Sequence, residues 1–278
     1  MKAEVTNQMR ARPRIKSADP PTSTLAAFDR IGLADLGTAG LMRRKDTKFM
    51  FTPGVLSELL AGLEREYEVL AVGGEPVQEY LTLYFDTARF DLFAAHHRGL
   101  GERVKVRERQ YLSTGQHFLE VKLRSIKGVT TKTRAESSAW DEALDVDTLP
   151  VREALLSSER IRRLAGSCLI PTLWNRYRRL TLVRKDRLER VTIDLGLSYA
   201  AEDRTYASER VVIAEVKQAK VDLSSPFMLR MRGAGLRPQS FSKYCMGVAL
   251  LRPELKHNRF KPTLRDLRFL DGGVRHVA

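Results

Sequence analysis

The sequence predicts an α+β fold: an antiparallel, closed β-barrel of about eight strands that forms a basic tunnel, with flanking helices. Three observations predict this class. Within residues 41–253, about eight runs alternate apolar and polar residues with period two, the pattern of a half-buried strand. Short polar or glycine-containing turns separate several neighbouring runs, as in an antiparallel meander. On most of these runs, the polar face is also cationic.

The runs and the stretches between them set the expected order of elements. The stretches 112–116 and 183–189 are expected to be hairpin turns. One helix is expected after Thr52, a good N-cap residue followed by Pro53 at the first helical position. Further helices are expected over residues 151–166, 224–234 and 243–251. The strand-like runs are residues 41–51, 78–87, 102–111, 117–124, 128–134, 172–183, 189–199 and 209–218.

Changes in composition divide the chain into three parts. Residues 1–40 are an N-terminal appendage, with disorder expected over 1–24 and a short docking helix over 24–37. Residues 41–253 carry the strand pattern and form the predicted tunnel domain. Residues 254–278 are a basic C-terminal tail, for which we expect no regular structure.

The chain of 278 residues is strongly basic. Its 48 Lys and Arg against 34 Asp and Glu give a formal net charge of +14. A hydrophobic fraction of 43% excludes a disordered basic tail protein, and no apolar run reaches the roughly 18 residues of a membrane span. The two cysteines, Cys168 and Cys245, lack the spacing of a disulfide framework or a zinc site. We therefore expect a cytoplasmic protein with a polyanionic partner.

The cationic face recurs on six of the runs. In residues 102–111, for example, Val104 and Val106 share one face, while Lys105 and Arg107 share the other. A sheet with one solvated face would explain any single run. It explains the set poorly, because solvated faces mix both signs and opposed like charges repel by roughly 4 kcal/mol at about 4 Å. A polyanion bound among these cations would remove that cost.

The geometry of a barrel turns this pattern into a predicted pore. If the apolar faces pack outward, the cationic faces line a lumen just wide enough for side chains or one small ligand. Arginine forks suit phosphate oxygens, and interleaved carboxylates suit a divalent metal ion beside phosphate. The pattern therefore predicts a pore that binds phosphate chains with a metal. Four carboxylates would share it: Asp46, Glu120, Asp194 and Glu215.

Nine short motifs in one order resemble the VTC domain, the catalytic domain of eukaryotic vacuolar polyphosphate polymerase. This domain belongs to the triphosphate tunnel metalloenzyme superfamily, and the likeness is to its bacterial single-domain members. The resemblance covers roughly residues 41–252. Its motifs are RKDTKF (44–49), YFDT (84–87), RVKVRER (103–109), FLEVKLR (118–124), KTR (132–134), RYRR (176–179), RVTID (190–194), AEVK (214–217) and SKY (242–244).

The resemblance implies a metal-dependent phosphotransferase that makes polyphosphate from the γ-phosphate of ATP inside the tunnel. Its ligands would be ATP, polyphosphate, triphosphate and pyrophosphate. The family's metal-binding glutamate resembles Glu215, expected to hold Mn²⁺ or Mg²⁺, while Glu120 and Asp194 are further candidates that could instead pair with tunnel cations. The implied catalytic residues are Lys48, Arg107, Lys122, Arg179 and Arg190. The implied phosphate-binding residues are Lys105, Lys132, Arg134, Tyr177 and Lys243, and the cationic strand faces add Arg44, Arg109 and Lys217.

Two other functions stay open. A hydrolase of the same fold would cleave triphosphate or a nucleoside triphosphate, and the hydrolytic relatives open with Glu-x-Glu-x-Lys. Here that register reads Arg44-x-Asp46-x-Lys48, which has one carboxylate fewer and favours a longer phosphate chain. A non-catalytic polyphosphate or nucleic-acid binder is the other alternative. RNA binding needs aromatics beside basic residues, whereas these runs interleave Val and Leu, so no specific nucleic-acid partner is expected.

Overall fold

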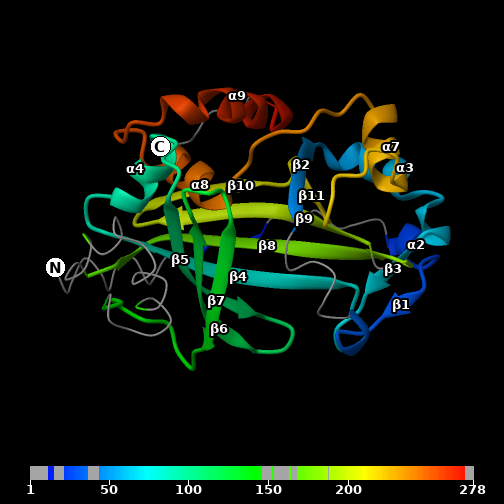
Figure 1. The fold of residues 1–278 in the computed structure, drawn as a ribbon, viewed down its shortest axis with the longest axis horizontal. Coiled ribbons are helices and arrows are strands. Elements are labelled where there is room, and N and C mark those ends of the chain that lie inside the picture. Colours follow the sequence, from blue (N-terminus) through cyan, green and yellow to red (C-terminus); the bar gives the residue numbers. More distant parts are fainter. Residues whose placement is uncertain are drawn as a thin grey trace.

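A long antiparallel sheet organises the molecule (Figure 1). The computed structural model describes residues 12–15, 22–36, 44–145, 152, 163, 168–186 and 188–272. Eight strands follow one another through the sheet in the order β2-β11-β9-β8-β4-β5-β6-β7. In chain order they are β2 (Lys45–Phe51), β4 (Val77–Asp86), β5 (Arg103–Tyr111), β6 (His117–Arg124), β7 (Thr130–Glu136), β8 (Ile170–Arg184), β9 (Glu189–Ala201) and β11 (Val212–Gln218).

Three short strands join this order at its sides. Strand β3 (Tyr67–Leu70) pairs with β8, and β10 (Arg204–Ser208) pairs with β9. Strand β1 (Arg30–Ile31) pairs in parallel with β3. The eight main strands coincide with the eight predicted runs to within a few residues, because period-two alternation marks a sheet with one apolar face.

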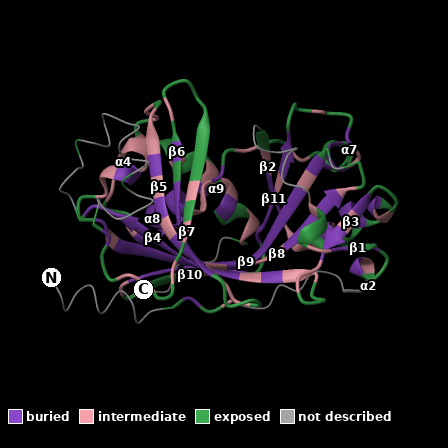
Figure 2. Cartoon of the chain, turned by 60° about the horizontal axis from the view of Figure 1, so that its bottom comes forward, coloured by how far each residue is buried: buried purple, intermediate pink, exposed green. Residues whose placement is uncertain are grey.

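The sheet curls into a half-barrel. The prediction of a closed barrel is only partly met, since β2 and β7 end the strand order and do not pair with each other in the described ranges. Figure 2 shows β8 and β9 buried along most of their length and β7 exposed. Across the open side, Lys122 of β6 is attracted by Asp46 and Glu215 of the β2–β11 wall and repelled by Lys48 of the same wall.

The apolar strand faces pack outward, as predicted. On the outside of β2, β11, β9 and β8, the core includes α2 (Thr22–Leu25), α3 (Leu56–Leu60) and α7 (Pro226–Gly233). On the outside of β4, β5 and β6, a second core closes over Trp174, with Trp140 packed against it. The inner face of the sheet is thereby left to polar side chains over much of its length.

One end of the inner face is covered by helices. Helix α8 (Lys243–Leu251) lies against β8 and β9 and shares a core with Tyr177, Tyr199 and α9 (Lys261–Leu270). The approach is close: a Cβ at Gly247 would lie 2.5 Å from Leu173 Cδ2 and 2.6 Å from the Tyr199 ring. Helix α4 (Asp91–His97) packs beside α8.

The expected helices had mixed outcomes. Those over 224–234 and 243–251 are confirmed as α7 and α8. The helix after Thr52 is interrupted: 3-10 turns (Pro53–Val55 and Leu63–Arg65) flank α3, and Gly62 turns the chain with φ of 81°. Only a short helix, Thr22–Leu25, and a 3-10 turn, Ala34–Leu36, stand near the helix expected over 24–37. The helix over 151–166, and the disorder expected over most of 1–24, concern residues largely outside those described.

The expectation of an irregular tail after residue 253 is wrong in part. Helix α9 occupies Lys261–Leu270, because Leu264 and Leu267 are spaced to share one face and are buried in the core beside α8. Asp271 then fixes the end of this helix, accepting hydrogen bonds from Tyr206 and Ser208 of β10.

No helix within the described ranges is both long enough and apolar enough to cross a bilayer.

Candidate functional site

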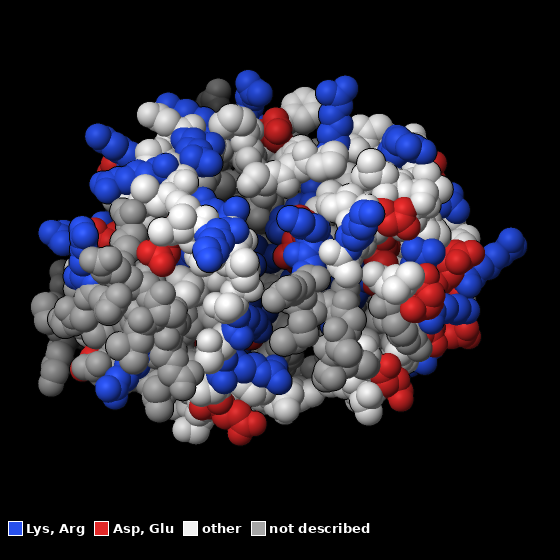
Figure 3. All heavy atoms as spheres, in the orientation of Figure 1, with Lys and Arg blue, Asp and Glu red and all other residues white. Residues whose placement is uncertain are grey.

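The candidate site is a cationic groove inside the half-barrel. One wall is formed by β2, β11 and the start of β9, the other by β5, β6 and β7, and β8 and β4 form the floor. Figure 3 shows Lys and Arg side chains gathered around the hollowed centre of this face. The charges of Asp46 and Glu215 on the opposite wall raise the pKa of Lys122 on β6, against the effect of burial. The two walls therefore face each other.

The β2–β11 wall holds Glu215 between two lysines. Lys48 Nζ lies 2.6 Å from one carboxylate oxygen, and Lys217 Nζ lies 2.7 Å from the other. Burial would raise the pKa of Glu215, but the two lysines outweigh it and hold that pKa well below the usual range. Burial lowers the pKa of Lys217 to about 8, against the opposing effect of Glu215. Lys217 also donates to Thr192 Oγ1 at 2.7 Å.

On the floor, Asp194 joins two cations that come from distant parts of the chain. Arg179 Nε and Nη2 donate to its two oxygens at 2.6 and 2.9 Å, and Lys243 at the start of α8 donates to the same carboxylate. Burial of Asp194 would raise its pKa, but these partners depress it strongly. Because Arg179 and Lys243 outnumber Asp194, the cluster keeps a positive charge.

A stacked tyrosine pair lies beneath these cations. The rings of Tyr80 and Tyr177 lie 5.3 Å apart with an interplanar angle of 10°. The Arg179 guanidinium carbon is 5.3 Å from the centre of each ring, and Lys243 Nζ is 4.5 Å from that of Tyr177. The negative faces of aromatic rings attract cations. The pair therefore fixes the direction in which these cations point.

The β5–β6–β7 wall is built around Glu120. Arg107 Nη2 lies 2.7 Å from it, Arg109 Nη1 lies 3.9 Å away, and Lys132 forms a third ion pair. Burial opposes the charged carboxylate, yet these three cations hold the pKa of Glu120 well below its usual range. Burial lowers the pKa of Lys132 to about 8, although Glu120 raises it. The Arg134 guanidinium lies over the ring of Phe118, with its carbon 4.8 Å from the ring centre.

Three further predicted cations have no carboxylate within 4.0 Å in the described parts of the chain: Lys105, Lys122 and Arg190. Burial lowers the pKa of Lys105 to about 8, and its Nζ donates to Ser242 Oγ at 2.9 Å. Burial, followed by repulsion from Arg44, lowers the pKa of Arg190. Arg190 stands opposite Lys217 in the β9–β11 register and so belongs to the same face.

The structure thus gathers the predicted site residues on one concave face. The twelve predicted Lys and Arg side chains share this face with the four predicted carboxylates. Such an excess of like charge is costly in a partly buried site unless an anion compensates it. Arg44 stands at the edge of the set, with Nε 3.1 Å from Asp46.

The carboxylates differ in how well they fit a metal ion. No three His, Cys, Asp or Glu side chains of the described residues come together as a metal site. The side chains of Glu120 and Asp194 are only 2% and 3% exposed, and cations engage both. Glu215 is 18% exposed and close enough to Lys122 to act on it, as is Asp46. One or two carboxylates completed by phosphate oxygens and water suit Mg²⁺ or Mn²⁺. Glu215 and Asp46, whose side chains are 18% and 22% exposed, fit that description better than the two buried carboxylates.

Sequence reasoning missed several contributors. Tyr80 stacks on Tyr177. The Tyr84 hydroxyl accepts a hydrogen bond from Arg107 Nη1 at 3.5 Å, and the Ser242 hydroxyl accepts one from Lys105. The signal for the tyrosines was available, since Tyr80 and Tyr84 are four residues apart on one strand and must share a face. No sequence signal pairs Ser242 with Lys105, because a long stretch of chain separates them.

The described part of the chain thus forms a curled antiparallel sheet with a cationic inner face. The sequence model described as "VTC domain" matches residues 43–252, and the chain belongs to that family. No curated protein matches the chain.

Solved structures similar to this chain were also found. A conserved hypothetical protein from Pyrococcus furiosus is 12% identical, with 73% of this chain and 99% of that one covered and a TM-score of 0.39. A protein from Hippeastrum, described as an adenylyl cyclase with a dominant triphosphatase activity, is 17% identical, with 76% and 97% covered and a TM-score of 0.38. A protein from Pyrococcus horikoshii is 12% identical, with 74% and 98% covered and a TM-score of 0.38.

Proposed function

We propose that the protein is a metal-dependent phosphotransferase that extends polyphosphate from the γ-phosphate of ATP inside the groove. The observation that carries this proposal is the cation excess on both walls and the floor, which suits an extended chain of phosphates. Family membership supports the same reading. Mn²⁺ or Mg²⁺, held by Glu215 and phosphate oxygens, would neutralise charge on the donor phosphates.

The reaction needs positioning more than a covalent nucleophile. A terminal oxygen of the acceptor chain forms a bond to the γ-phosphorus of ATP, the bond from that phosphorus to the β–γ bridging oxygen breaks, and ADP leaves. The equatorial oxygens gain contacts with fixed cations as the transition state forms. Arg107 and Arg179 suit this role, because Glu120 and Asp194 hold their forks in place.

The remaining proposed residues have supporting roles. Lys48, Lys122 and Arg190 would bind phosphates from the two walls, together with the phosphate-binding set named from the sequence. Glu120 and Asp194, considered as metal ligands from the sequence, are proposed here as counter-ions that orient arginines. We also propose that the barrel closes around a bound phosphate chain, which would neutralise the cations of both walls.

Hydrolysis of triphosphate or a nucleoside triphosphate is the second candidate. Asp46 and Glu215 both act on Lys122, so two carboxylates stand near one another on the β2–β11 wall. Two carboxylates there would support a more hydrolytic metal site. Water would then replace the acceptor chain, and phosphate would be released.

The test is purified protein incubated with ATP and Mn²⁺ or Mg²⁺, with and without a short polyphosphate primer. Growth of a phosphate chain on a gel, matched by ADP release, is the expected result. Phosphate release without chain growth would select the hydrolase. If neither product forms with any metal or primer, the protein is instead a non-catalytic polyphosphate binder.

A further inference from the structure

The cationic inner face of β5 and β6 continues past the predicted site. Arg103 and Arg124 stand opposite each other in the β5–β6 register, two residues beyond Lys105 and Lys122 and on the same side of the sheet. Side chains directly opposite each other on antiparallel strands interact, and like charges there are destabilising. The inner face therefore ends in a further pair of cations, which the proposed function does not use.

Arg259 joins this pair from a distant part of the chain. It lies in a 3-10 turn, Asn258–Phe260, that packs against α4, and α4 packs against β5. Gly99, just after α4, leaves room for the guanidinium, since a Cβ there would lie 2.6 Å from Arg259 Cζ. The charge of Arg259 acts on Arg103. Together, Arg103, Arg124 and Arg259 form an arginine cluster at one end of the groove.

No carboxylate in the described part of the chain compensates the arginine cluster. None lies within 4.0 Å of any of its three guanidinium groups. Burial lowers the pKa of Arg103, and repulsion from Arg124 and then from Arg259 lowers it further. The Nε of Arg103 is buried without a hydrogen-bond partner. Such an arrangement is unfavourable unless an anion binds there.

The surroundings of the arginine cluster on the α4 side are basic as well. Burial, and then the positive charge of its neighbours, lowers the pKa of His97 at the end of α4. The strongest of those neighbours are His257, Arg259, Lys256 and Arg98. An anion at this end of the groove would therefore be attracted from the strands and from the α4 side together.

We propose that the arginine cluster binds the part of a polyphosphate chain that extends beyond the groove, so that the protein holds long chains more tightly than short ones. The inference rests on the proposed function and adds the length of the ligand to it. Arg103 and Arg124 lie about 7 Å along the strands from Lys105 and Lys122, because two residues of an antiparallel strand span about that distance. A linear phosphate chain can contact both pairs, and planar guanidinium groups suit its oxygens. A ligand with three phosphates, held by the groove cations, gains less from the cluster.

Calorimetric titration with two phosphate chains, without added metal, tests the inference independently of turnover. The ligands are tripolyphosphate and a long linear polyphosphate, and the variant is Arg103→Gln/Arg259→Gln. We expect wild type to bind the long chain more tightly than tripolyphosphate. The variant should bind the long chain roughly 10-fold more weakly, with little change for tripolyphosphate. The salt dependence of long-chain binding should also become shallower, because fewer counterions are released.

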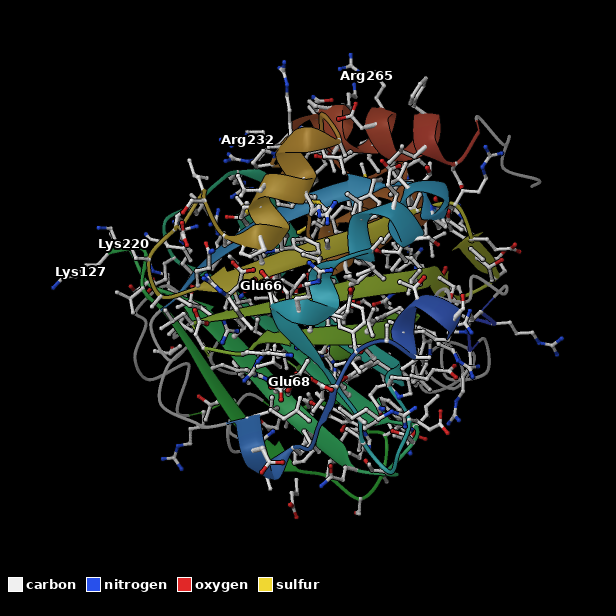
Figure 4. All side chains as sticks on the ribbon, turned by 90° about the vertical axis from the view of Figure 1, so that its right-hand side faces the viewer. Glu66, Glu68, Lys127, Lys220, Arg232 and Arg265 are labelled. Carbon is white, nitrogen blue, oxygen red and sulfur yellow. The ribbon has the colours of Figure 1, made fainter. Side chains whose placement is uncertain are left out.

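A control variant and a second cluster variant make the test specific. Arg232→Gln/Arg265→Gln removes the same charge at two exposed positions on α7 and α9 (Figure 4) and should behave like wild type. Arg124→Gln/Arg259→Gln changes two exposed arginines and must show the same selective loss, so the result does not depend on the half-buried Arg103. Equal loss of affinity for both chains, or no loss, would overturn the inference.

A groove variant separates this inference from the proposed function. Lys105→Gln/Lys122→Gln should weaken the binding of both chains. If long-chain binding depends on the arginine cluster but not on these lysines, the cluster binds polyphosphate by itself and the groove proposal fails. If the groove variant weakens both chains and the cluster variants weaken neither, the groove proposal stands and the inference fails. Single-stranded RNA that binds the cluster as tightly as the long chain would also overturn the inference, since the ligand would then be a nucleic acid.

Discussion

Glu215 lies between Lys48 and Lys217 on the β2–β11 wall, and in the proposed function it would also hold the metal ion. Its partial exposure and its position opposite Lys122 distinguish it from Glu120 and Asp194, which are enclosed by cations. At the scale of single residues, the groove therefore has carboxylates of two kinds: Asp46 and Glu215 are partly exposed, and Glu120 and Asp194 orient arginines.

Replacement of Glu215 by Gln is expected to abolish turnover while leaving tripolyphosphate affinity unchanged or higher. The amide keeps an acceptor for Lys48 or Lys217 but removes a negative charge from a phosphate site and a ligand from the metal. Product formation and calorimetric binding measure the two effects. Glu66→Gln, on an exposed glutamate before β3 (Figure 4), is the control and should change neither. Normal turnover in Glu215→Gln would end its assignment to the metal.

Asp194→Asn is expected to destabilise the protein by about 3–5 kcal/mol, because it leaves Arg179 and Lys243 without their carboxylate. Saturating tripolyphosphate should recover much of this loss, since phosphate oxygens replace the missing charge. Urea unfolding with and without the anion measures both effects. A loss that the anion does not reduce would place this cluster outside the binding site.

At the scale of elements, Asp86 joins the end of β4 to two helices. Its carboxylate accepts from the backbone N–H groups of Thr87, Leu92 and Phe93 at 2.7, 2.8 and 2.9 Å, and from the Tyr244 hydroxyl of α8. The YFDT motif thereby ties the end of β4 to the first turn of α8. Since Lys243 and Ser242 lie at the start of α8, this buried junction positions two groove contacts without touching the groove.

Asp86→Ala is expected to cost about 3–5 kcal/mol of stability, because it leaves several buried donors without an acceptor. Asp86→Asn, which keeps one acceptor oxygen, should cost less. Chemical unfolding of both variants, together with tripolyphosphate affinity, checks the prediction. Equal stability of Asp86→Ala and wild type would show that the junction is not needed to hold α8.

At the scale of the whole molecule, the groove gives the free protein an electrostatic penalty that anions remove. A phosphate chain at about 100 times its dissociation constant should add roughly 2.7 kcal/mol to the free energy of unfolding. For a chain of this size that is a rise in Tm of roughly 5–10 °C. Thermal melting with tripolyphosphate, against sodium chloride at equal ionic strength, measures it. An unchanged Tm would contradict an anion site in the groove.

The same penalty predicts an unusual dependence on pH. The pKa values of Lys105, Lys132 and Lys217 are about 8 in the folded protein, below those of unfolded lysine. Between about pH 8 and 10 the unfolded chain binds more protons than the folded one, so stability should rise with pH. Urea unfolding at pH 7.5 and 9.5 measures the rise.

Sulfate binding provides a second measurement of the same lysines, because the charge of sulfate itself is constant over that pH range. It favours the protonated lysines, so its affinity should fall as the pH passes 8, and saturating sulfate should flatten the rise in stability. Lys105→Met/Lys217→Met is the control and should show a smaller pH effect. A stability that falls between pH 7.5 and 9.5 without anions would contradict the lowered pKa values.

The amino-acid sequence by itself determined the strands and the direction in which each strand's side chains point. Alternation in residues such as Val104, Lys105, Val106 and Arg107 is a local property, and it separates an apolar face from a cationic one wherever the strand is placed. The motif order also sufficed to indicate the family, which the match over residues 43–252 confirms. The spacing of Leu264 and Leu267 on one helical face is also a local property of the sequence. The basic residues around these two leucines hide it, so the sequence predicts an irregular tail there.

Only the tertiary structure decided which charges meet. Asp194 finds Lys243 across a long stretch of chain, and Arg14 reaches the outer side of β8, because contacts of this kind depend on how the sheet curls rather than on spacing. The open edge between β2 and β7 is likewise a property of the tertiary structure, since the alternation of each strand says nothing about whether the first and last strands meet. Local patterns set the face of each side chain, and long-range electrostatics set its partners.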